Sequence, residues 1–250
     1  MTKTRDAGHQ FALFFADVSA VHHVVNGELM INDADMVRRI SSILRLRPGD
    51  SLLLFDQQMH MEVVLLSLEK KKIICQIKNI KQNNIITPHI TVWLPLLKRE
   101  AFEHAIYSLV ELGVNTIQLV STAKEQRHWH GQKELNRLHN IMIAAAEQSK
   151  NFALPLLKEP RTLQELLLAK SGEKSLFFDV QGKPLLEVAN ACALQKNNAY
   201  IILVGPEGDL TESEKNQLRN DQFMFVHLTP TILRAQQAVA VGVGALRSLL

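Results

Sequence analysis

The sequence predicts an α/β protein with two parts, a mostly β N-terminal part and a larger part in which strands and helices alternate. Short apolar runs broken by glycine or charged turns fill the chain up to about residue 85, and strand-length and helix-length segments alternate after it. The polar stretch 81–84 leads to Thr87 and Pro88 and separates the two patterns. We therefore expect one domain over 1–84 and another over 85–250.

Four strands and one helix are expected in the N-terminal part. The helix is predicted over Asp33–Leu44, with Asp33 as a possible N-terminal cap. The strands are apolar runs of strand length, namely Phe11–Ala16, Ser51–Asp56, Met61–Leu66 and Ile73–Ile77. We interpret this set as a small β-barrel with one helix.

The alternation in the C-terminal part predicts a parallel sheet covered by helices on both faces. The expected strands are Ile90–Leu94, Thr116–Val120, Ser175–Phe178, Ala199–Val204 and Met224–Leu228. The expected helices are 100–112, 133–150, 162–169, 184–193, 212–220 and a last one from about residue 235. Gly113 is well placed to end its helix, and Thr211 with Glu214 has the pattern of a capping box.

The composition favours a cytoplasmic protein that does not enter a membrane. Apolar residues make up 46% of the chain, enough for a sizeable core, yet no apolar run approaches the length of a membrane span. The N-terminus lacks the apolar core of a signal peptide. Cys75 and Cys192 form no C-x-x-C pair and indicate a reducing compartment. Cys75 lies within an apolar run and is expected to be buried.

Two strand ends lead through tight loops into helices and are the main indication of a ligand site. The apolar run Ile201–Val204 enters Gly205-Pro206-Glu207-Gly208, and Phe225–Leu228 leads through Thr229–Arg234 to the last helix. In an open α/β sheet, ligands bind at the carboxyl ends of strands, where such loops gather. The first loop matches neither phosphate-binding glycine pattern. From its residues alone it is either a ligand loop or an ordinary strand–turn–helix connection.

Basic residues cluster in the first third of the chain, although the net charge of +3 is small. Four arginines and no acid lie between Met36 and Gly49, and five lysines and no acid lie between Lys70 and Lys81. Such clusters are the electrostatic footprint of a protein that binds a nucleic-acid backbone. A solvated basic face is the alternative explanation.

Four motifs occur in an order that resembles the RsmE family of ribosomal RNA methyltransferases, which are similar to the wider SPOUT class of S-adenosylmethionine-dependent enzymes. They are Ile43–Asp50 with Leu54–Asp56, Glu111–Val114, Ala145–Ser149 with Pro155, and the GPEG loop Gly205–Gly208 with Ile232-Leu233-Arg234. Together they run from about residue 35 to about residue 245. One four-residue motif would be weak evidence, whereas four ordered motifs across the chain are strong.

The resemblance implies a PUA-like RNA-binding barrel in the N-terminal domain and a SPOUT α/β domain with a deep trefoil knot in the C-terminal one. It also implies an enzyme of ribosome biogenesis that uses S-adenosylmethionine to methylate N3 of a uridine in 16S ribosomal RNA. The implied partners are this RNA, within the small ribosomal subunit, and a second copy of the chain in a homodimer formed through the last helix.

The resemblance places the cofactor among three loops that follow predicted strands. The implied cofactor-binding residues are Phe178, Leu203, Val204, Gly205, Pro206, Glu207, Gly208, Leu228, Thr229, Pro230, Ile232 and Leu233. Arg234 is a catalytic candidate, because a cation favours the deprotonated uracil ring. Glu207 is the other candidate. It is either a hydrogen-bond partner of cofactor or substrate, or a carboxylate favoured by a helix N-terminus.

The basic side chains and the departures from the family pattern bear on the RNA substrate. The RNA-binding candidates are Arg38, Arg39, Arg45, Lys98 and Lys124. The chain departs from the pattern mainly at Arg39, Ser108, Ala123, Lys124, Asn151, Asp209, Thr231, Gln236 and Gln237. Because the cofactor loops are better preserved than these side chains, two alternatives stay open. One is an RNA-binding or ribosome-assembly protein with weakened catalysis, and the other is a methyltransferase with a different RNA target.

No metal is expected as a cofactor. His128 and His130 flank Trp129, but two histidines at this spacing without a third ligand usually lie in a loop. Trp93 is expected in the core of its strand.

Overall fold

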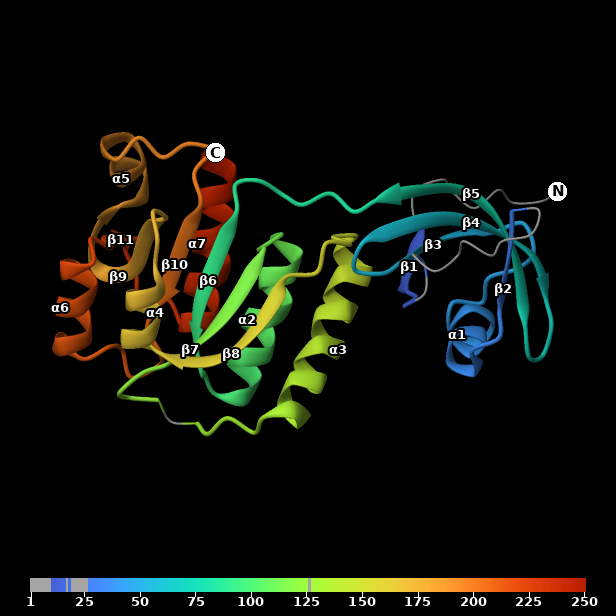
Figure 1. Ribbon diagram of the computed structural model, residues 1–250, viewed down its shortest axis with the longest axis horizontal. Helices are drawn as coiled ribbons and strands as arrows, with labels where there is room; N and C mark the ends of the chain where they lie inside the picture. The colour runs from blue at the N-terminus through green and yellow to red at the C-terminus, as the bar shows by residue number, and fades with distance from the viewer. Residues whose placement is uncertain (1–9, 17, 19–26, 126) are drawn as a thin grey trace. The chain divides into compact units, whose positions relative to one another are not determined.

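The computed structural model describes residues 10–16, 18, 27–125 and 127–250 (Figure 1). The chain forms two compact units. The first comprises 1–84 together with 147–153, and the second comprises 85–146 and 154–250. No helix of the described residues is long and apolar enough to cross a membrane.

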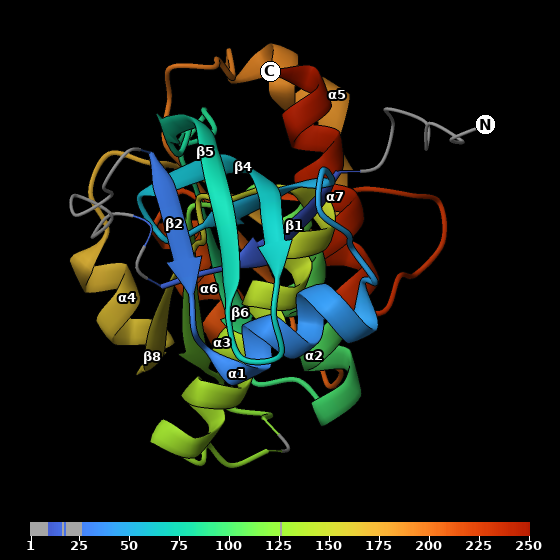
Figure 2. The same ribbon diagram turned by 90° about the vertical axis from the view of Figure 1, so that its right-hand side faces the viewer.

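The first unit contains a five-stranded mixed sheet. Its strands are β1 (Phe11–Phe14), β2 (Glu28–Ile31), β3 (Ser51–Phe55), β4 (Met59–Leu68) and β5 (Ile73–Gln82). They lie in the order β1-β3-β4-β5-β2, with β1 parallel to β3 and the other neighbours antiparallel. Figure 2 shows β4, β5 and β2 side by side. Among the described strands, β1 and β2 are the two edges of this sheet.

The predicted helix of the first unit consists of α1 (Ala34–Arg38) and a π-helical turn, η2 (Arg39–Ile43). Asp33 caps α1 as expected, because its Oδ1 accepts a hydrogen bond of 2.8 Å from the backbone N–H of Met36. Apolar residues of α1 and η2 are buried together with those of the sheet. Cys75 is fully buried, as predicted, and this burial raises the pKa of its thiol to about 11.

Strand β2 is not predicted from the sequence. It has only four residues, begins with a charge and alternates exposed Glu28 and Met30 with buried Leu29 and Ile31. So short a run gives little periodic signal, and pairing with β5 decides its conformation.

Residues 147–153 pack within the first unit. The Glu147 carboxylate accepts the backbone N–H of Phe14 at 2.9 Å and forms an ion pair of 2.6 Å with Arg39. The Phe152 ring packs against that of Phe55 with centroids 4.7 Å apart. The glutamate of the A-A-E-Q-S segment therefore holds together two parts of the first unit that are far apart in the sequence.

The second unit contains a six-stranded sheet in which every pairing is parallel, as the alternation predicts. Its strands are β6 (Ile90–Pro95), β7 (Thr116–Ser121), β8 (Leu156–Thr162), β9 (Lys174–Pro184), β10 (Tyr200–Val204) and β11 (Met224–His227). The order is β11-β9-β10-β6-β7-β8. Strands β6 and β10 are almost completely buried, which explains their continuous apolar sequences.

Strand β8 is the second strand that the sequence does not predict. It contains Lys158, Glu159, Pro160 and Arg161, a composition that argues against a central strand. The structure places β8 at the edge of the sheet, where its register with β7 shifts beside Pro160. An edge position tolerates a residue that donates no backbone hydrogen bond.

Helices cover both faces of this sheet, as expected. They are α2 (Arg99–Glu111), α3 (Gln132–Ser149), α4 (Leu163–Ala169), α5 (Leu185–Ala191), α6 (Glu212–Asn220) and α7 (Ala235–Leu249). Apolar residues of α4 and α6 are buried with Trp93, Phe177, Ile201 and Leu203 on one face. Helix α7 packs against α2 and β10 (Figure 1).

The helix ends follow the predicted local chemistry. Gly113 follows α2 with φ 68°, a left-handed conformation that glycine adopts without strain. Thr211 and Glu214 form a complete capping box at the start of α6. Because all six strands are parallel, the ends of β9, β10 and β11 lie at one edge of the sheet.

Candidate functional site

A pocket that is open to solvent lies between the bulge of β9, the end of β11 and the start of α7. Its lining residues are Phe178, Asp179, Val180, Val226, His227, Leu228, Thr229, Thr231, Leu233 and Ala238. Most of them are apolar, with a few polar groups among them, which is the usual composition of a small-molecule site. Of the predicted cofactor residues, the pocket brings together Phe178, Leu228, Thr229 and Leu233.

The close approach of two backbones shapes one side of the pocket. Strand β9 pairs with β11 up to Phe177, and the pairing resumes only at Lys183, so the residues between them bulge out. At Gly182 a Cβ atom would lie 2.3 Å from the backbone nitrogen of Val226. Only glycine fits such a contact without displacing β11.

His227 is the main polar side chain of the pocket that the sequence did not indicate. Its Nδ1 lies 2.8 Å from the carbonyl oxygen of Gly182. A carbonyl oxygen only accepts hydrogen bonds, so Nδ1 carries the proton and Nε2 is an acceptor when the ring is neutral.

The first turns of α7 form another side of the pocket. Ala238 lines it, and one turn later Gly242 lies against the Phe178 ring, so closely that a Cβ there would be 2.0 Å from Cε2 of Phe178. Phe178 is 8% exposed. The ring therefore contacts Gly242 of α7 on one side and faces the open pocket on the other.

The GPEG loop follows β10 at the same edge of the sheet, but none of its residues is among those that line the pocket. Leu203 and Val204 are buried within β10. A Cβ at Gly205 would lie 2.9 Å from Oδ1 of Asp209, so the loop folds back tightly on itself. Pro206 accepts the backbone N–H of Asp209 through its carbonyl oxygen and closes this turn.

Glu207 and Gly208 connect the GPEG loop to neighbouring elements. Oε1 of Glu207 accepts the backbone N–H of Lys98 at 2.9 Å, and Lys98 immediately precedes α2. The carboxylate thus acts at a helix N-terminus, that of α2 rather than α6. Nζ of Lys124 donates to the carbonyl oxygen of Gly208 at 3.1 Å. Two predicted RNA-binding lysines are therefore gathered at this loop.

The remaining predicted residues of the second strand end are exposed. Ile232 is 83% exposed, and Pro230 is also at the surface. Arg234 is exposed and occupies the N-cap position of α7, where its side chain makes no capping hydrogen bond. Its carbonyl oxygen instead accepts the N–H groups of Gln237 and Ala238.

One buried lysine connects the bulge within β9 to the loop after β10. Nζ of Lys215, on α6, lies 2.7 Å from Oδ2 of Asp179 and 2.7 Å from Oδ2 of Asp209. Burial lowers the pKa of Lys215, but the hydrogen bonds to the two carboxylates outweigh it, and the pKa is raised overall. The lysine is therefore charged at neutral pH.

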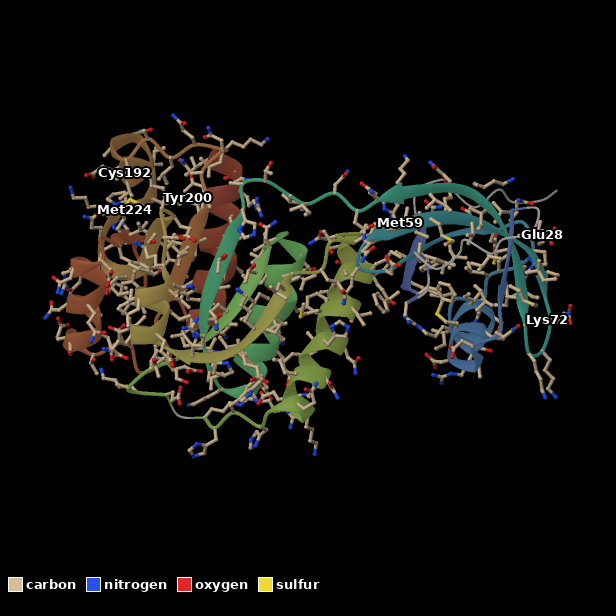
Figure 3. The ribbon with its side chains drawn as sticks, viewed as in Figure 1. Glu28, Met59, Lys72, Cys192, Tyr200 and Met224 are labelled. Carbon is tan, nitrogen blue, oxygen red and sulfur yellow. The ribbon has the colours of Figure 1, made fainter. Side chains whose placement is uncertain are left out.

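The predicted RNA-binding arginines of the first unit differ in their surroundings. Arg38 forms an exposed pair with Asp35, whereas Arg39 is partly buried in its pair with Glu147. Arg45 is exposed and has φ 53°. The lysines of the second basic run lie on the β4–β5 hairpin, with Lys72 at its tip (Figure 3).

Sequence reasoning missed Asp179, Val180, Val226, His227, Thr231 and Ala238 as pocket residues. The first five adjoin predicted residues at the strand ends, so extending each loop by two positions would have found them. No local signal marks Ala238, which lies one turn from the start of the last helix. Among the described residues, no group of three or more potential metal ligands is close enough to hold an ion.

Comparisons with known proteins indicate the family of this chain. A family described as RNA methyltransferase domain matches residues 85–247. The ribosomal RNA small subunit methyltransferase E of Mycobacterium bovis is 25% identical over 229 residues, which cover 88% of this chain and 86% of that protein. The protein of the same name from Mesomycoplasma hyopneumoniae is 30% identical over 165 residues, 65% of this chain and 70% of that one.

A solved structure shows the same fold. It is a ribosomal RNA small subunit methyltransferase E from Neisseria gonorrhoeae bound to S-adenosyl methionine, with a TM-score of 0.79 and 24% identity over 96% of this chain and 98% of that one. The family that the four sequence motifs indicate is therefore confirmed. The chain belongs to the RsmE family of RNA methyltransferases.

Proposed function

We propose that this protein transfers the methyl group of S-adenosylmethionine to N3 of a uridine in 16S ribosomal RNA of the small ribosomal subunit. The observation that carries the proposal is the pocket between the bulge of β9 and the end of β11, within the region that matches the RNA methyltransferase family. The similar proteins from Mycobacterium bovis and Mesomycoplasma hyopneumoniae are both named for methylation of small-subunit ribosomal RNA.

The pocket fits the cofactor in chemical character. Phe178, Leu228 and Leu233 offer apolar walls, and His227 and Thr229 offer hydrogen-bonding groups. S-adenosylmethionine supplies an activated methyl group, so the protein has mainly to bind, orient and exclude water. Gly182 and Gly242 support this role, because each allows the pocket walls to approach more closely than a Cβ would permit.

The uridine must leave its stack in the RNA before N3 becomes accessible. The proposed contacts are Lys98 and Lys124 beside the GPEG loop and the exposed cations of the first unit, including Arg45. Arg234, which is exposed at the start of α7, would favour the deprotonated ring by its positive charge.

The finer architecture is part of the proposal. Residues 1–84 would form a PUA-like RNA-binding domain, and 85–250 a SPOUT domain whose C-terminal segment is threaded into a trefoil knot. The proposed threading is supported by the segment after β11, which returns to the sheet so that α7 packs on β10 and on Phe178. A homodimer through α7 is supported by the exposed apolar residues Ile232 and Val241 near and on that helix.

Methyl transfer to ribosomal subunits tests the proposed function. Small subunits that lack the modification are incubated with the protein and labelled S-adenosylmethionine, and the product is mapped by mass spectrometry. We expect a single N3-methyluridine. Cofactor binding without transfer would instead favour a role in RNA binding or ribosome assembly, and transfer only to another RNA would identify a different target.

Replacing Arg45 with alanine is expected to weaken RNA binding and to reduce the slope of log affinity against log salt concentration by about one. Alanine at φ 53° has the same backbone strain as arginine, so the change mainly removes the charge. The measurement is a salt titration of RNA affinity, with cofactor affinity expected to stay constant. Lys196→Ala, an exposed change in the second unit, is the control. An equal salt slope in both variants would argue against an RNA contact at Arg45.

Replacing Arg234 with alanine is expected to lower turnover by about tenfold or more while cofactor affinity changes little. The helix should persist, because the backbone of residue 234 and not its side chain bonds to the first turn of α7. Single-turnover kinetics and calorimetric titration with S-adenosylmethionine separate the two effects. Equal losses of affinity and turnover would assign Arg234 to binding instead.

A further inference from the structure

Lys215 connects the bulge within β9 to the loop that follows β10. Its side chain is 8% exposed, and its Nζ reaches Asp179, directly after Phe178, and Asp209, directly after the GPEG loop. Strands β9 and β10 are hydrogen-bonded neighbours whose pairing ends at Phe178 and Val204, so the bulge and the GPEG loop begin side by side. One ammonium on α6 thus joins the pocket wall to the GPEG loop.

Asp179 uses its two carboxylate oxygens for different purposes. Oδ1 accepts the backbone N–H of Gln181 at 2.7 Å, and Oδ2 accepts the hydrogen bond from Lys215. The side chain is 3% exposed, so water does not replace these partners. The residue lines the pocket between Phe178 and Val180. Fixing its carboxylate therefore fixes the backbone of this wall.

Asp209 binds the same ammonium from the GPEG loop, with a side chain that is 56% exposed. Its φ of 58° is left-handed, a conformation that aspartate and asparagine tolerate better than most residues. Oδ1 accepts the backbone N–H of Leu210 at 2.7 Å and faces Gly205, while Oδ2 pairs with Lys215. The carboxylate thus ties the loop to α6 through Lys215.

The charges of this cluster are unequal. Two carboxylates share one ammonium, and Nζ also lies 5.9 Å from the centroid of the Phe177 ring. Without the lysine, Asp179 would be a buried carboxylate whose Oδ2 had lost its partner, a costly arrangement that the loop would relieve by moving. Without the charge of Asp209, by contrast, Lys215 and Asp179 would remain a balanced buried pair.

We propose that Lys215 is a positioning residue for the cofactor pocket, because its bridge between Asp179 and Asp209 sets the pocket wall against the GPEG loop. This inference rests on the proposed function, since the ligand whose site is positioned is S-adenosylmethionine. Lys215 itself does not line the pocket, so it acts through the two loops.

Two variants test the bridge. Asparagine also tolerates a left-handed backbone, and Asp209→Asn leaves the ion pair of Lys215 with Asp179 intact, so the melting temperature should stay unchanged. The affinity for S-adenosylmethionine should fall about threefold or more. Lys215→Met removes both links and should lower the affinity about tenfold or more. Turnover at saturating cofactor should change less than affinity in both. Lys215→Arg should restore much of the affinity, because a guanidinium can hold two carboxylates.

Glu212→Gln on the same helix is the matched control, because the pair of Glu212 with Arg219 is long and exposed. Amide hydrogen exchange without cofactor is the second readout: Lys215→Met should speed exchange in residues 178–182 and 205–209, and Glu212→Gln should not. Unchanged exchange and affinity in Lys215→Met would overturn the bridge. A wild-type protein that binds no S-adenosylmethionine would overturn the proposed function, whatever the exchange shows.

Discussion

Replacing Gly242 with alanine is expected to lower the affinity for S-adenosylmethionine by about tenfold or more. The added Cβ would lie 2.0 Å from Cε2 and 2.3 Å from Cζ of Phe178, far inside van der Waals contact. Phe178 is 8% exposed, so its ring has little room to move except toward the pocket that it lines. We therefore expect the ring to take up cofactor space. Calorimetric titration with S-adenosylmethionine measures the effect.

Gly244→Ala is the control for this change. Gly244 lies on the same helix, where the nearest neighbour of an added Cβ is Leu112 at an ordinary 3.6 Å. Alanine is a better helix former than glycine by about 1 kcal/mol, so both variants gain the same helix propensity and only one meets the ring. Unaltered affinity in Gly242→Ala would show that the position of the Phe178 ring does not matter to the cofactor site.

Replacing Arg247 with methionine is expected to lower the free energy of unfolding by about 2–3 kcal/mol. The guanidinium donates to the carbonyl oxygens of Pro88 and Gly113 and to Oδ1 of Asn115. It thus ties α7 to the segment before β6 and to the turn after α2. Burial lowers the pKa of Arg247, but an arginine remains charged at neutral pH. Methionine would leave the two carbonyl oxygens without this donor, whereas Oδ1 of Asn115 would still accept the backbone N–H of Ile90.

Thermal and denaturant unfolding measure this loss. For a chain of this size the melting temperature should fall by roughly 5–10 °C. Arg99→Met is the control, because Arg99 is 71% exposed in its pair with Glu103 and an exposed pair contributes little. If both variants unfolded alike, the buried hydrogen bonds of Arg247 would not be what holds the last helix.

Local sequence patterns predict most elements of the second unit. Strand β10 is a run of apolar residues buried on both faces, and α6 begins at the capping box of Thr211 and Glu214. Such signals depend on residues that are close in sequence, so they are readable without the fold. Strand β8 lacks them, because Pro160 and three charged residues are tolerated only at the sheet edge that the fold gives it.

The site is only partly predictable for the same reason. The sequence identifies Phe178 and Leu228, which do line the pocket, although β9 runs on past Phe178 to Pro184. It singles out Glu207 without finding its partner. That partner is the backbone N–H of Lys98, which lies far away in the sequence. His227 gains its fixed tautomer only because Gly182 brings a carbonyl oxygen to its ring.

By itself, the sequence determined the family, the alternation of strands and helices and the caps that begin and end several of them. The tertiary structure alone decided the strand order β11-β9-β10-β6-β7-β8, which does not follow the order of the chain. It also decided that Lys215 joins Asp179 to Asp209 and that Gly242 touches Phe178. Propensity and periodicity arise between near neighbours, whereas these contacts arise from packing between segments that only the folded sheet brings together.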